Sequence, residues 1–153
     1  MTIIPAENGV FATESPALWP PLTTKACSVD FSIGPEIAPV EAMERAVAMV
    51  RFAVPRFFAE PDGETAVNVS ERAEAVLREL VDVTARHKRP ETYLTGRVEY
   101  DGSHVTISVG DMARSLPGPE EEPGLYLVYG MASEVGQYAG DHGGRVTWAA
   151  VPA

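Results

Sequence analysis

The sequence of 153 residues contains one cysteine and only 12 basic residues, and both shortages exclude broad classes of function. Cys27 cannot form an intramolecular disulfide, and no Cys or His pattern around it suits a zinc site, so the chain fits a reducing compartment. The 12 basic residues stand against 22 acidic ones, which gives a formal net charge of -10. Because a phosphate backbone repels such a chain, we expect no nucleic-acid partner.

Long apolar runs and the common nucleotide loops are also missing. No stretch of about 18 apolar residues could cross a membrane, and the first residues lack the basic and apolar regions of a signal peptide. We therefore expect a cytoplasmic protein with no membrane partner. The sequence contains no Walker P-loop, no GxGxxG and no Ser-His-Asp arrangement, and its three histidines are too scattered for a metal triad.

What is present suffices for one folded domain. The chain is 45% hydrophobic and 22% charged, which is the balance of an ordinary globular domain. Residues 1–24 have no hydrophobic period and contain Pro5, Pro16, Pro20 and Pro21. We expect a flexible, proline-rich arm over residues 1–24 and the folded domain over residues 25–153.

Hydrophobic periodicity and turn residues predict the order β, α, α, β, β, loop, α, β. The expected elements are a strand ending before Gly34, helices over 40–58 and 68–88, strands over 92–100 and 104–109, a polar loop over 111–122, a helix over 124–135 and a strand over 145–151, with a further short strand around 137–139. Asn68 is the expected N-cap of the second helix, and Asp101-Gly102 predicts a hairpin. The order favours an α+β fold, a two-layer sandwich whose mixed, mainly antiparallel sheet carries helices on one face.

Two carboxylates are candidates for chemistry. On a helical wheel the second helix has a core stripe, and Glu79 lies beside it, with Val83 between Glu79 and the core. The stripe consists of Val69, Ala73, Val76, Leu80, Thr84 and His87. Asp111 follows an apolar strand, where a carboxylate can face a crevice. The alternatives remain open that Glu79 is a solvated boundary residue and Asp111 an ordinary turn residue.

Taken together, four segments resemble the histidine-kinase-like (GHKL or Bergerat) ATPase superfamily. They are Glu79-Leu-Val, the strand ending in Asp111, Pro123-Gly124-Leu-Tyr-Leu-Val, and Gly143-Gly144-Arg-Val-Thr147-Trp148. Within the superfamily they look most like the small anti-sigma-factor serine kinases and ATP-binding regulatory proteins of high-GC Gram-positive bacteria. The resemblance covers residues 25 to 151 and implies a Bergerat-type fold.

The resemblance also implies roles for individual residues. Glu79 would be the catalytic general base, and ATP would be the cofactor. The cofactor-binding residues would be Asp111 on the adenine amino group, together with Ala113, Gly124, Leu125 and Thr147. Two positions depart from the pattern: Val83 stands where the family has its magnesium-holding Asn, and Ala113 stands where it has a glycine. Valine offers no oxygen to a hard cation, so we expect no metal ligand there.

Three functions follow from these observations. The first is a regulatory protein with a degenerate ATP-binding domain, a pseudoenzyme that acts on a sigma factor or an anti-anti-sigma-type protein through protein contacts. The second is an active serine kinase that phosphorylates an anti-anti-sigma factor. The third is a small α+β interaction domain with no nucleotide binding. The altered site favours a protein without enzymatic activity, and the sequence leaves a homodimer open.

Overall fold

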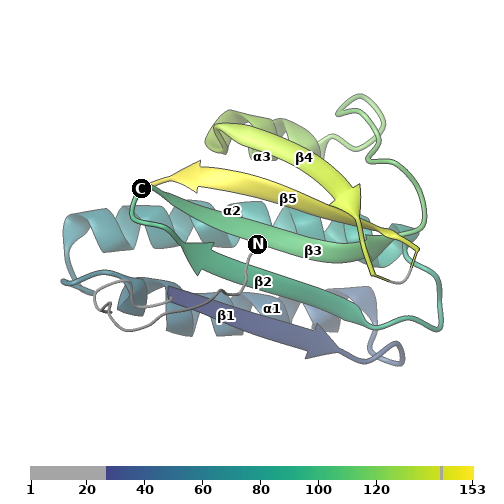
Figure 1. The fold of residues 1–153 in the computed structure, drawn as a ribbon, viewed down its shortest axis with the longest axis horizontal. Helices are drawn as coiled ribbons and strands as arrows, with labels where there is room; N and C mark the ends of the chain where they lie inside the picture. The colour runs from purple at the N-terminus through teal and green to yellow at the C-terminus, as the bar shows by residue number, and fades with distance from the viewer. Residues whose placement is uncertain (1–26, 142) are drawn as a thin grey trace, which may run out of the picture.

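The structure, a computed structural model, describes residues 27–141 and 143–153 and has an α+β fold (Figure 1). A five-stranded sheet in the order β1-β2-β3-β5-β4 carries the helices on one face. The elements along the chain are β1 (Cys27–Ile33), α1 (Pro39–Ala53), the 3-10 helix η1 (Val54–Phe57), α2 (Glu64–His87), β2 (Leu94–Tyr100), β3 (His104–Met112), α3 (Gly124–Met131), β4 (Glu134–Ala139) and β5 (Arg145–Pro152). The predicted arm, residues 1–24, lies outside the described residues.

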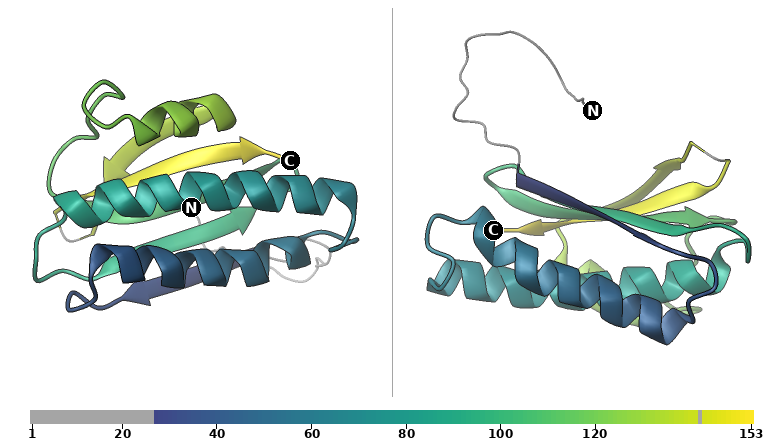
Figure 2. Two further views of the ribbon diagram at one scale, coloured as in Figure 1. Left: turned by 180° about the vertical axis from the view of Figure 1, so that it is seen from behind. Right: turned by 90° about the horizontal axis from the view of Figure 1, so that it is seen from below.

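The two-layer arrangement predicted from the sequence is confirmed (Figure 2). Seen from below, α1, α2 and α3 all lie on one side of the sheet, and no described helix covers the other side, here called the open face. All four strand pairs are antiparallel, so the sheet is not mixed. Because β4 and β5 also pair antiparallel, each strand of the described sheet runs opposite to its neighbours.

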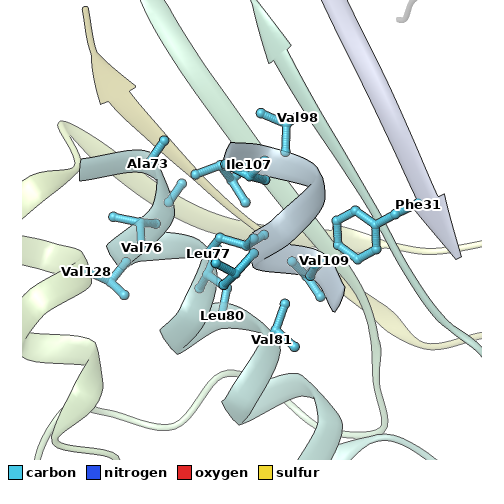
Figure 3. Packing of buried hydrophobic residues seen from close by; sticks show 14 of the residues in the cluster. Phe31, Ala73, Val76, Leu77, Leu80, Val81, Val98, Ile107, Val109 and Val128 are labelled. Atoms are coloured by element: carbon cyan, nitrogen blue, oxygen red, sulfur yellow. The ribbon is translucent and has the colours of Figure 1, made fainter. Parts of the chain in front are cut away.

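The core lies between α2 and the helix-facing side of the sheet (Figure 3). Val76, Leu77 and Leu80 of α2 have no exposed surface, and they pack against strand residues such as Ile107 and Val109. The predicted stripe is buried from Val69 to Thr84, and His87 is half-buried at the helix end. Apolar residues therefore recur about every 3.6 residues along α2 and every second residue along the strands, and the two sets pack together as one core.

The hairpin between β2 and β3 is also confirmed. Oδ1 of Asp101 accepts hydrogen bonds from the backbone N–H groups of Ser103 and His104, each at 2.8 Å. Gly102 has a φ of 98°, which a residue with a side chain rarely adopts. These two residues fix the turn and hence the register of β2 against β3.

Several predicted boundaries were wrong. The first helix ends at Ala53, because Pro55 lies in the 3-10 turn that follows it. The second helix starts at Glu64 with Gly63 as its N-cap, and Asn68 is an exposed residue inside it. The earlier start buries Ala66 one turn before Val69, which extends the apolar stripe.

Helix α3 and strand β3 also differ from their predicted bounds. Helix α3 ends at Met131 rather than residue 135, and the residues after it form the edge strand β4, which starts at Glu134. Strand β3 continues past Val109 to Met112, with a register shift against β5 between these two residues. No helix in the described part of the chain is long and apolar enough to cross a membrane.

Candidate functional site

Three of the predicted site residues meet where α3 begins beside α2. Glu79, Gly124 and Leu125 line a cavity of about 180 Å³, which Val83 also lines. The carboxylate of Glu79 lies so close to Gly124 that a Cβ at this position would collide with it. Only a glycine can therefore begin α3 while Glu79 keeps this conformation.

An ion-pair network fixes the loop that precedes α3. Both carboxylate oxygens of Glu122 accept hydrogen bonds from the guanidinium of Arg86, at 3.0 and 2.5 Å. Arg86 also donates to Asp82 at 2.9 Å, and Nε2 of His87 lies 3.3 Å from Glu122. The hydrogen bonds from Arg86, helped by His87, lower the pKa of Glu122 to about 2. The end of the acidic loop is thus tied to the last turns of α2, and it forms one wall of the cavity.

Two of the backbone N–H groups that could bind a phosphate at the start of α3 already donate hydrogen bonds within the protein. The N–H of Leu125 donates to the carbonyl of Glu122 at 2.9 Å, and the N–H of Tyr126 donates to that of Pro123 at 3.0 Å. An anion at a helix N-terminus needs free donors of this kind. A phosphate could bind the N–H groups of Leu125 and Tyr126 only if the turn before α3 changed its conformation.

The position that would hold magnesium offers no ligand atom. The Val83 side chain is 2% exposed and belongs to the core cluster. Around the cavity the carboxylates are those of Glu79, Asp82 and Glu122, and the last two already bind Arg86. No group of three or more His, Cys, Asp or Glu residues within 27–141 and 143–153 could hold a metal ion.

Thr147 is buried in a polar contact that the sequence did not predict. Its Oγ1 accepts a hydrogen bond from Nε2 of Gln137 at 2.9 Å and lies 3.4 Å from Sδ of Met112. Oε1 of Gln137 in turn accepts the backbone N–H of Leu116 at 2.9 Å. Met112 and Gln137 therefore occupy the surroundings of Thr147, a residue that the resemblance assigns to the same nucleotide site as Asp111.

Asp111 is not part of this arrangement. It lines two other cavities, of about 450 and 360 Å³, and it does not line the one beside Glu79. The register shift of β3 explains the separation, because it directs Met112 into the core next to Thr147 while its neighbour Asp111 faces away. Ala113 is exposed, and its N–H donates to the carbonyl of His87 at 2.8 Å.

No protein-family model matches this chain, and no curated protein matches it. The carboxylate of Glu79, which lies against Gly124, could accept a proton from a hydroxyl group brought to the cavity. Around Thr147, the amide of Gln137 hydrogen-bonds to Thr147, to Met112 and to the backbone N–H of Leu116.

Proposed function

We propose that this protein is a cytoplasmic regulatory protein that acts through contacts with a protein partner and is built on a degenerate ATP-binding domain. The resemblance to the anti-sigma-factor serine kinases makes a sigma factor or an anti-anti-sigma-type protein the expected partner. One observation carries the proposal: the residues expected to form one nucleotide site lie in three separate environments. Glu79 and Gly124 share a small cavity, Thr147 binds Gln137 and Met112, and Asp111 lines other cavities.

The surface of α3 supports a role in protein contacts. Tyr126, Leu127 and Tyr129 are 62%, 37% and 48% exposed, although α3 has only eight residues. Tyrosines supply large contact areas at low entropic cost, and they are enriched in protein interfaces. These three side chains, here called the α3 patch, are the partner-binding surface of the proposal.

Calorimetric titration tests the nucleotide half of the proposal. We expect the full chain to show no saturable binding of ATP or ADP at millimolar concentration, with or without magnesium. The variant Val83→Asn places an amide oxygen beside Glu79. If the missing metal ligand were the main defect, this variant would bind ATP more tightly by about 1 to 3 kcal/mol in the presence of magnesium. Because Gln137, Met112 and the Arg86–Glu122 pair also alter the site, we expect no gain. Tight binding of magnesium-ATP by the wild type would contradict the proposal.

The partner half is tested with purified sigma factors and anti-anti-sigma-type proteins from the same cell. We expect one of them to bind the wild type, and the double variant Tyr126→Ser, Tyr129→Ser to bind it at least about tenfold more weakly. Tyr93→Ser is the matched control, since Tyr93 is 58% exposed and lies outside the α3 patch. Equal binding by all three forms would exclude the α3 patch as the interface.

An active serine kinase is the second candidate, and one observation favours it. Glu79 and Gly124 lie together at the start of α3, as a general base beside a phosphate loop would require. The kinase would transfer phosphate from ATP to a serine of an anti-anti-sigma factor, and Glu79→Gln would abolish the transfer. Incorporation of labelled phosphate into such a partner by the wild type would favour this candidate over the first.

A further inference from the structure

A cavity on the open face of the sheet takes no part in the function proposed above. Its volume is about 450 Å³, which is within the range of small-molecule sites. Side chains from all five strands and from the turn before β5 line it. The polar ones are Asp30, Thr95, Arg97, Ser108, Asp111, Tyr138 and Asp141.

Acidic groups outnumber basic ones in this lining. Arg97 is the one cationic side chain among the described residues that line the cavity, and it is held by Asp30. Nε of Arg97 donates to Oδ1 of Asp30 at 2.6 Å, and its Nη2 donates to Oδ2 at 3.2 Å. The carboxylates of Asp111 and Asp141 are left without a cation in the lining. The cavity therefore has a negative potential.

Asp111 adds a second, independent observation. Its Oδ2 is buried and has no hydrogen-bond partner among the residues that the structure describes. Gly140 and Gly144 make room for this oxygen, since a Cβ on either would lie only 2.5 or 2.8 Å from it. A buried carboxylate oxygen without a donor is unfavourable by about 1 to 3 kcal/mol. The rest of the Asp111 side chain is partly exposed and lines the cavity, so a positive charge bound there would offset this cost.

Tyr138 provides an aromatic surface beside these carboxylates. The side chain is 53% exposed and lies on β4 at the border of the cavity. Burial raises the pKa of its hydroxyl, Arg97 lowers it, and the carboxylates of Glu99, Asp141 and Asp111 raise it. The ring thus lies within range of the carboxylates of the cavity, and its face can contact a cation.

From this geometry we propose that the open-face cavity binds an organic cation that carries a guanidinium or primary ammonium group. Such a group donates several hydrogen bonds and one positive charge, which are what Asp111 and Asp141 lack. Its planar or methylene portion contacts Tyr138. Anions are repelled by the same carboxylates. The inference is independent of the proposed regulatory function, since it uses neither the α3 patch nor the cavity beside Glu79.

The test is calorimetric titration of the full chain with agmatine, which has a guanidinium and an ammonium group and no carboxylate. We expect saturable binding that weakens with added salt, because opposite charges are screened. Asp111→Asn, which keeps the shape of the side chain, is expected to weaken binding at least about tenfold. Glu134→Gln is the matched control, because it removes one negative charge from the open face outside the cavity. We expect this control to change affinity less than about twofold.

Two further variants separate recognition from a general effect of charge. Arg97→Gln removes the competing cation and frees Asp30, so we expect agmatine to bind several times more tightly. Tyr138→Ala replaces a half-exposed side chain, which folding does not require, and we expect weaker binding. Thermal unfolding of each variant verifies that it is folded. Absence of agmatine binding, or equal weakening by Asp111→Asn and Glu134→Gln, would overturn the proposal.

A capped pentapeptide with a central arginine identifies the source of the cation. If the peptide binds more tightly than agmatine and Asp111→Asn weakens it, the cation belongs to a polypeptide. If agmatine binds more tightly, the cation belongs to a small metabolite. Either result supports the proposed site. If the peptide and agmatine both bind Asp111→Asn with the same affinity as the wild type, the proposed site is contradicted.

Discussion

Along β3, Val105, Ile107 and Val109 face the helices and have no exposed surface, whereas Thr106 and Ser108 between them face the open side and are half-buried. The two faces are thus made from alternate residues of the same strands. On the helix side, apolar side chains fill the space between the sheet and α2. On the open side, charged and hydroxyl groups surround a cavity.

The difference separates stability from recognition. A side chain on the helix side contacts many neighbours in a close-packed interior, so its volume and shape are constrained. A side chain on the open side contacts solvent and a few polar groups, so it can change without loss of the fold. We therefore expect substitutions on one face to alter the free energy of unfolding and those on the other to alter ligand binding.

Two neighbours on β3 give the largest expected contrast. Ile107→Ala leaves a cavity in the core and is expected to lower the free energy of unfolding by about 2 to 5 kcal/mol. Ser108→Ala, one residue further on the open face, is expected to change it by less than about 0.5 kcal/mol. Urea unfolding of both variants measures the contrast. Similar losses would show that the open face is also packed in solution.

A glycine provides the next test of the helix-facing side. The ring of Phe31 lies over Gly96, its partner across the β1–β2 pair, and a Cβ at this position would collide with the ring. Gly96→Ala is expected to lower the free energy of unfolding by about 1 to 3 kcal/mol. Gly130→Ala is the control, since nothing lies within 4 Å of a Cβ there, and this helical position is expected to gain up to about 1 kcal/mol. Equal changes in the thermal midpoint of Gly96→Ala and Gly130→Ala would contradict the contact between Phe31 and Gly96.

The loop before α3 has a smaller, pH-dependent effect. The pKa of Glu122 falls from 4.5 to about 2 on folding, so its ion pair stabilises the protein above about pH 4.5 and is lost as the pH falls toward 2. Glu122→Gln is expected to cost about 1 to 2 kcal/mol at pH 7, after screening by solvent, and well under about 1 kcal/mol at pH 2, where Glu122 is about half protonated in the folded protein. Glu121→Gln, at an exposed side chain, is the control. A difference between wild type and Glu122→Gln that is as large at pH 2 as at pH 7 would exclude this origin.

The ion pair on the open face is also expected to contribute little to stability. The Asp30–Arg97 pair is exposed, with 63% and 53% of the two side chains accessible. Asp30→Asn is therefore expected to change the free energy of unfolding by less than about 1 kcal/mol in chemical denaturation. The same variant leaves Arg97 unpaired in the cavity, so agmatine is expected to bind more weakly. A large loss of stability would remove the distinction between the faces.

The elements that periodicity predicts best are those with a long repeated pattern. The stripe from Val69 to Thr84 fixed the buried face of α2, and Asp101-Gly102 fixed the hairpin. Asn68 misled the prediction of the helix start, because a residue that can cap a helix is also tolerated on its exposed side. Whether such a residue is a cap depends on the turn before it, here the extended backbone of Gly63.

The candidate site was harder to predict for a different reason. One register shift in β3 reverses which of two neighbours, Asp111 and Met112, faces the core, and the sequence around them has no signal for the shift. Gln137 gave no signal either, since its amide matters only because β4 brings it to Thr147. The distribution of site residues over separate cavities follows from these tertiary contacts.

The strand order has a consequence for synthesis. β4 has β5 as its only strand neighbour in the described sheet, yet β5 follows it in the chain. While a ribosome makes this protein, the backbone groups of β4 remain unpaired until the residues from Arg145 onward emerge. An edge strand without its partner can pair with other chains, so premature termination within β5 would leave a product prone to aggregate rather than a shortened but functional domain.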